Sequence, residues 1–157
     1  MTDATTATAT AERAASAPLL SASAVFDGAA DGGAIGSARA FTADFLTAAS
    51  AVGRPPVPED RVGLATLVVS ELVTNAVRHT SGPCRLLLEL RRDAVEISVF
   101  DRAAAAPVPH GHDPARVGQH GLEIVVAVCG SVAVEPGPEG KRVRARLPLL
   151  AGDPGTG

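Results

Sequence analysis

Apolar side chains recur at intervals of three and four residues in three stretches of the chain, which is the spacing of amphipathic helices. The first stretch predicts a helix over residues 35–49, ended by Gly53 and the prolines after it. Its apolar positions are Ala38, Phe41, Phe45 and Ala48. The second predicts a helix from Pro58 or Glu59 to His79. Its core-facing stripe is Val62, Ala65, Val69, Leu72, Val73 and Ala76. The third predicts a helix over residues 121–128.

Two pairs of strand-like segments separate and follow these helices. Residues 84–91 and 94–101 are joined by a short turn, and residues 131–135 are followed across a Pro- and Gly-rich turn by residues 141–148. The resulting order is helix, helix, strand, strand, long irregular stretch, helix, strand, strand. This order predicts an α+β fold, a two-layer sandwich in which helices cover one face of a mixed, mostly antiparallel sheet.

The two ends of the chain lack such patterns. Residues 1–24 are mostly Ala, Thr and Ser, and residues 151–157 are rich in Gly. Segments of this composition bury too little apolar surface to offset their ordering entropy, so we expect disordered tails. The folded domain is then expected over residues 25–150.

Composition narrows the class of protein. Of the 157 residues, 46% are hydrophobic, which is enough for one core, and no run is long and apolar enough to predict a membrane span. The first twenty residues lack the pattern of a signal peptide, so we expect a cytoplasmic protein that does not bind membranes. The net charge of -3 argues against direct, sequence-independent binding of nucleic acid. Cys84 and Cys129 can form one disulfide, although two core thiols are the simpler interpretation.

The second predicted helix carries the most informative polar residues. Glu71, Asn75, Arg78 and His79 follow one another at i, i+4, i+7 and i+8, so they share one stripe, which we expect largely opposite the core-facing side. A carboxylate and an amide one turn apart can offer oxygen atoms to one hard cation, or one can bind the cation while the other takes a proton. The same spacing is also typical of a solvated helix surface.

Two further features are weak when taken alone. Asp101 ends an apolar strand, where it can accept a hydrogen bond from a ligand or simply begin a turn. Gly118 and Gly121 flank Gln119 and His120 directly before a helix, an arrangement that suits anion binding and equally suits an ordinary flexible connection. Between them, His110, His112 and Asp113 can hold Zn²⁺ or be polar residues of an exposed loop.

Taken together, an acid–amide helix, a strand-terminal Asp and a glycine loop before a helix resemble the N, G1 and G2 boxes of the histidine kinase-like (GHKL, Bergerat-fold) ATPase superfamily. The segment VVSELVTNAVRHT, the earlier ARAFTADFLTA and the later KRVRARLP are similar to the single-domain anti-sigma-factor serine/threonine kinases of actinobacteria. The resemblance covers residues 35–149.

This resemblance implies a role for each matching residue. Asn75 would be the Mg²⁺ ligand, Glu71 the general base, and Asp101 the acceptor for the adenine amino group of ATP. Gly118, His120 and Gly121 would lie in the lid over the phosphates, with positive charge from Arg78 or His79 nearby. Two departures affect the adenine end. Alanines rather than glycines follow Asp101 and Arg102, and Arg142 stands near the place of a nucleotide-binding threonine.

The resemblance also implies partners. We expect an ATP- and Mg²⁺-dependent protein serine/threonine kinase that phosphorylates an anti-anti-sigma protein and restrains a sigma factor. Relatives of this kind often dimerise, so a homodimer remains open. The altered G1 region motivates the alternative of a non-catalytic regulatory module that binds partners with weak or no nucleotide turnover.

Overall fold

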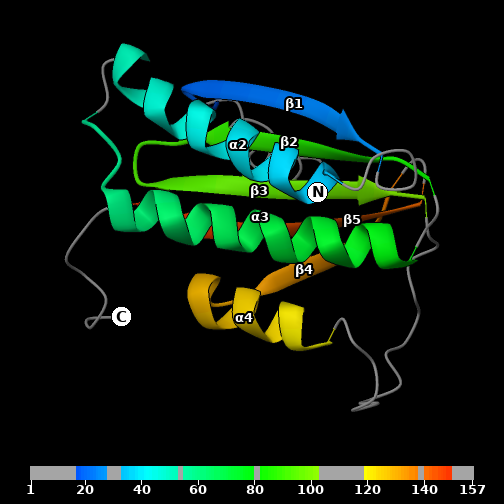
Figure 1. The fold of residues 1–157 in the computed structure, drawn as a ribbon. Helices are drawn as coiled ribbons and strands as arrows, with labels where there is room; N and C mark the ends of the chain where they lie inside the picture. Colours follow the sequence, from blue (N-terminus) through cyan, green and yellow to red (C-terminus); the bar gives the residue numbers. More distant parts are fainter. Residues whose placement is uncertain are drawn as a thin grey trace, which may run out of the picture.

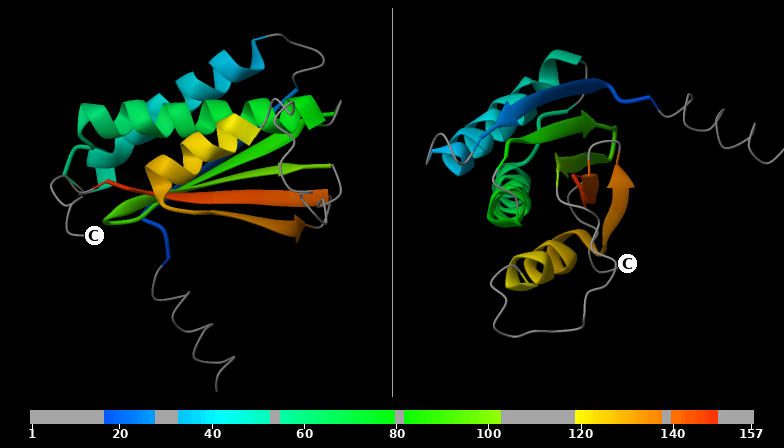
Figure 2. Two further views of the ribbon diagram at one scale, coloured as in Figure 1. Left: turned by 90° about the horizontal axis from the view of Figure 1, so that it is seen from below. Right: turned by 90° about the vertical axis from the view of Figure 1, so that its right-hand side faces the viewer.

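The alternating strand residues build one five-stranded sheet, and the helices lie together on one of its faces (Figures 1 and 2). This computed structural model describes residues 17–27, 33–52, 55–79, 82–102, 119–137 and 140–149. Its strands are β1 (Leu20–Phe26), β2 (Cys84–Leu90), β3 (Ala94–Asp101), β4 (Val132–Gly137) and β5 (Gly140–Pro148). They lie in the order β1-β2-β3-β5-β4. The predicted α+β sandwich is confirmed, and all pairings of the described strands are antiparallel rather than mixed.

Strand β1 corrects the expected end of the N-terminal tail. Residues 20–24 pair with β2 instead of being disordered, and the expected boundary between residues 24 and 25 falls inside this strand. Small residues hide the pattern, but they alternate. Leu20, Ala22 and Phe26 pack against the core, whereas Ser21 and Ser23 are exposed. Residues 1–16, like residues 150–157 at the other end, lie outside the described part of the chain.

The predicted helices are confirmed, with small shifts at their ends. They are α2 (Ala34–Thr47), α3 (Glu59–His79) and α4 (Gln119–Cys129), and a 3-10 turn, η1 (Ala48–Val52), follows α2. Because the helix tightens after Thr47, Ala49 rather than Ala48 becomes buried. No helix among these described residues is long and apolar enough to cross a membrane.

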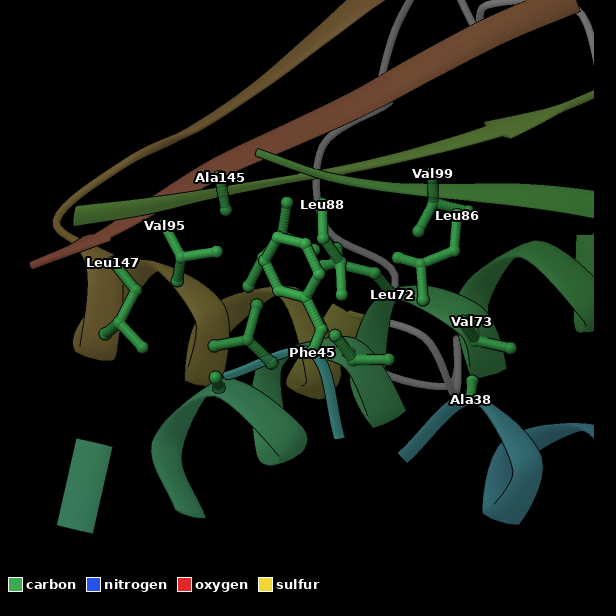
Figure 3. Packing of buried hydrophobic residues seen from close by; sticks show 14 of the residues in the cluster. Ala38, Phe45, Leu72, Val73, Leu86, Leu88, Val95, Val99, Ala145 and Leu147 are labelled. Atoms are coloured by element: carbon green, nitrogen blue, oxygen red, sulfur yellow. The ribbon is translucent and has the colours of Figure 1, made fainter. Parts of the chain in front are cut away.

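The core lies between the sheet and helices α2 and α3. Leu72 and Val73 of α3 meet Leu86 and Leu88 of β2, with Phe45 of α2 completing the layer (Figure 3). Burying aliphatic side chains of this size stabilises the fold by about 1.5–3 kcal/mol for each one. The core therefore holds α3 in a fixed position against the strands.

Candidate nucleotide site

Four element ends meet at one end of the sheet. Helix α3 and strand β3 run in the same direction, so the last turns of α3 and the end of β3 lie together (Figure 1). Strand β5 starts there because Asp101 of β3 pairs with Lys141. Helix α4 also begins there and packs against α3. The topology thus brings together sequence segments that lie tens of residues apart.

Glu71 and Asn75 lie one turn apart on α3, on the side that faces α4. Asn75 is only 6% exposed, whereas Glu71 is half-buried. The expectation that their stripe lies opposite the core is therefore wrong for Asn75. It comes three positions after Leu72, which places the two side chains only about 60° apart around the helix. Asn75 flanks the core, and its amide is held by packing instead of moving freely in water.

The first turn of α4 fits closely against Glu71 because residue 121 is a glycine. A Cβ atom built on Gly121 would lie 2.7 Å from Oε1 of Glu71, well inside van der Waals contact. The absence of a side chain therefore lets α4 approach this carboxylate. The start of a helix exposes unpaired N–H groups and carries partial positive charge, so it favours negative groups nearby.

This part of the site fits a magnesium–phosphate group. Mg²⁺ takes oxygen ligands and commonly binds through one or two protein groups together with substrate phosphates. Asn75 supplies a buried amide oxygen, Glu71 a partly exposed carboxylate, and the start of α4 lies beside them. Asn75 is the residue that would hold the metal, and Glu71 remains available for proton transfer.

Asp101 lies at the end of β3 and is buried, with 3% of its surface exposed. Its cross-strand neighbour Lys141 is also buried, and Lys141 Nζ lies 3.7 Å from Asp101 Oδ2. Gly140 makes this close pairing possible, because a Cβ there would overlap the backbone of Asp101 and Arg102. Sequence reasoning missed Lys141, although alternation along β5 places it on the same face as Val143 and Ala145.

Arg142 does not take part in this site. The same alternation turns its side chain to the uncovered face of the sheet. There it donates hydrogen bonds to Ser98 Oγ at 3.1 and 3.3 Å, and its guanidinium lies 5.2 Å from the centre of the Phe100 ring. The correspondence expected between Arg142 and the nucleotide-binding threonine is therefore wrong. Lys141 is the residue at the start of β5 that faces the helices.

Cys84 starts β2 near Asp101, on the same side of the sheet. Burial, reinforced by the negative charge of Asp101, raises the pKa of its thiol from 9.0 to about 11. Burial alone raises the pKa of Cys129 to about 11. Both cysteines are free, so the interpretation as thiols is confirmed, with Cys84 buried and Cys129 partly buried. Protonated thiols are poor nucleophiles and poor metal ligands.

The remaining candidates are placed only in part. Arg78 is exposed near the end of α3, two turns beyond Glu71. His79 ends α3 and His120 lies in the first turn of α4, but their side chains are outside the described part of the structure. Gly118, His110 and His112 lie outside the described residues altogether. Their expected roles in a lid or metal site stay predictions.

The chain has the arrangement of a known family. The sequence model of the histidine kinase-like ATPase domain matches residues 34–147, a span that includes α2, α3, α4, β2, β3, β4 and all of β5 except its last residue. No curated protein matches the sequence. The matched span contains Glu71, Asn75, Asp101 and Gly121, together with every described element that meets at the site. The chain therefore belongs to the histidine kinase-like ATPase domain family.

Proposed function

We propose that this chain is an ATP- and Mg²⁺-dependent protein serine/threonine kinase. Family membership suggests ATP binding, and the observation that carries the finer proposal is the placement of Glu71 and Asn75. One residue offers a buried amide and the other a carboxylate one turn away, and Gly121 brings the start of α4 against that carboxylate. Phosphoryl transfer depends mainly on positioning and on neutralising charge, and a metal ligand beside a base contributes to both.

In the proposed reaction, Glu71 acts on the hydroxyl of the acceptor protein. The hydroxyl oxygen bonds to the γ-phosphorus while the bond from that phosphorus to the β–γ bridging oxygen breaks, and ADP leaves. Glu71 takes the hydroxyl proton on a carboxylate oxygen. Asn75 would hold Mg²⁺, which neutralises charge on the phosphates when bound. The N–H groups at the start of α4 add donors for the same oxygens.

The other site residues have supporting roles in this proposal. Asp101 accepts a hydrogen bond from the adenine amino group at the inner end of the site. Gly118 and His120 belong to the segment that covers the phosphates, together with Gly121. Arg78 or His79 would add positive charge at the end of α3, where the triphosphate would extend.

We also propose the biological setting that the sequence resemblance implies. The acceptor would be a serine or threonine of a small anti-anti-sigma protein, and the same chain would bind and restrain a sigma factor. The segment 68–80, which contains Glu71 and Asn75, carries most of this resemblance. A homodimer would be compatible with this role.

The test is phosphate transfer from γ-labelled ATP to an anti-anti-sigma protein that is recovered with this chain by affinity capture. Glu71→Gln keeps the shape of the side chain but removes the base, so we expect labelling to fall by a factor of about 10² to 10⁴ while nucleotide binding survives. Glu59→Gln, in the first turn of the same helix, is the matched control and should label normally. Labelling unchanged in Glu71→Gln would rule out the assigned base.

A second candidate function is a non-catalytic module that binds partners in this fold. It is favoured by one observation, the burial of Asp101 in an ion pair with Lys141, because that contact engages the carboxylate expected to read adenine. This alternative predicts partner binding that is insensitive to ATP and to Asn75→Ala. Binding that responds to both would favour the kinase.

A further inference from the structure

Lys141 is the only lysine in the chain, against thirteen arginines. It is 8% exposed, and its ammonium lies beside the carboxylate of Asp101, which is still more deeply buried. A lysine head group is a compact charge with three donors and no acceptor, whereas arginine presents a broad planar fork. The single lysine of this chain therefore lies at the carboxylate that the proposed function assigns to the base of ATP.

The distance between the two head groups limits what can bind Asp101. Lys141 Nζ is 3.7 Å from Asp101 Oδ2, which is close enough for attraction but beyond the usual length of a hydrogen bond. An amino group that donates to Oδ2 of Asp101 therefore lies close to the ammonium as well. Two donors cannot bond to each other, so the ammonium needs an acceptor on the same ligand or must be displaced.

Adenine supplies such an acceptor on either side of its amino group. Ring nitrogens N1 and N7 both flank the exocyclic amine, and each carries a lone pair. Displacing Lys141 instead would separate the buried ammonium from the carboxylate of Asp101, and separating two buried opposite charges is unfavourable. A ligand that satisfies the acceptor Asp101 and the donor Lys141 together avoids this cost.

We propose that Lys141 is a second base-reading residue of this site. Asp101 accepts from the exocyclic amino group, while the Lys141 ammonium donates to a ring nitrogen next to it. The inference rests on the proposed binding of ATP and adds a specificity determinant from the opposite strand. Gly140 fixes its position, because the absence of a side chain there lets the start of β5 lie against the backbone of Asp101.

The test removes the proposed hydrogen bond in two ways, by replacing the donor Lys141 and by replacing the acceptor nitrogen of the base. Wild-type protein and Lys141→Met are titrated with the magnesium complexes of ATP, 1-deaza-ATP and 7-deaza-ATP, in which N1 or N7 is replaced by a C–H group. A hydrogen bond from a charged donor corresponds to about a tenfold change in affinity or more. We expect wild-type protein to bind one analogue about tenfold more weakly than ATP. Lys141→Met should bind ATP about tenfold more weakly and no longer distinguish that analogue.

Arg144→Met is the matched control, since Arg144 lies on the same strand but bonds to Glu135 on the uncovered face. It should leave all three affinities unchanged. Tighter ATP binding by Lys141→Met would show that the lysine competes with the base, and it would overturn the proposal. Equal affinity of the wild-type protein for ATP and both analogues would also overturn it. Failure of the wild-type protein to bind any of the three would instead refute the proposed function.

A second measurement is independent of whether the variant folds. Wild-type protein labelled with lysine that carries ¹³C at Cε alone gives a single lysine side-chain signal in NMR spectra, because Lys141 is the only lysine in the sequence. ATP should shift this signal, and the analogue that lacks the contacted nitrogen should shift it much less at saturation. Equal shifts with ATP and both analogues would contradict the assignment.

Discussion

Replacing Gly121 by alanine should separate catalysis from stability. The added Cβ would lie 2.7 Å from Glu71 Oε1, whereas ordinary contacts begin near 3.4 Å. The carboxylate must therefore retreat by about 0.7 Å. Because it is the end of a flexible side chain, the retreat costs little folding free energy. Alanine in place of a helical glycine stabilises by up to about 1 kcal/mol, so Gly121→Ala should be as stable as the wild-type protein or slightly more stable.

The expected loss is in the rate of phosphate transfer. Misplacing a reacting group by about 1 Å can reduce a rate by about 100-fold, so a shift of this size should reduce it by roughly 10- to 100-fold. The affinity for Mg·ATP should change much less, because the three atoms nearest to the new methyl group all belong to Glu71.

The assay combines transfer from γ-labelled ATP with thermal unfolding. Gly63→Ala is the matched control, since Gly63 also lies in a helix and a Cβ there would meet nothing within 4 Å. It should gain similar stability and keep full activity. Full activity in Gly121→Ala would refute the placement of Glu71 as the base, and a loss of activity in Gly63→Ala would show that the effect is not local.

Three further predictions concern stability. Burial and the charge of Asp101 raise the pKa of Cys84 to about 11, so its thiol ionises more readily in the unfolded chain than in the folded protein. The free energy of unfolding should therefore fall by up to about 2–3 kcal/mol between pH 9 and pH 11. Denaturant titrations at several pH values should show a shallower fall for Cys84→Ala; an equally steep fall would contradict this cause. Gly140→Ala should lower the free energy of unfolding by about 1–3 kcal/mol, because its Cβ would overlap the backbone of Asp101. Gly137→Ala is the control and should not lower it, because a Cβ there would make only ordinary contacts. Similar denaturation midpoints for the two variants would count against this packing. Leu72→Ala should cost about 2–5 kcal/mol in the same titrations because Leu72 is only 1% exposed, and a loss below 1 kcal/mol would be inconsistent with its central position.

Most of the fold was predictable because its helices and four strands have clear apolar periods. Helix α3 matches the predicted span from Glu59 to His79. Strand β1 was missed because serine and alanine fill most of its positions, and its stability comes from pairing with β2, more than fifty residues away in sequence. The composition of residues 20–26 alone therefore does not predict that they pair with β2.

The relative positions of site residues could be predicted for those on the single helix α3, and less well for those on the paired strands β3 and β5. The spacing of Glu71 and Asn75 follows from α3 alone, whereas the burial of Asn75 depends on how α3 packs. The partnership of Asp101 and Lys141 depends on the β3–β5 register, which joins residues forty positions apart. The alternation of side chains along β5 places Lys141 and Arg142 on opposite faces of the sheet, and this could have been predicted without knowing the register between β3 and β5.

Calorimetric titration of Mg·ATP into the wild-type protein and Asn75→Ala tests the central claim most directly. The account predicts magnesium-dependent binding by the wild-type protein. It also predicts that folded Asn75→Ala loses the contribution of magnesium while its affinity for ATP in the presence of EDTA equals that of the wild-type protein. Equal binding of Mg·ATP by the two proteins, or no binding by either, would contradict the assignment of Asn75 and Glu71 to a magnesium–triphosphate site.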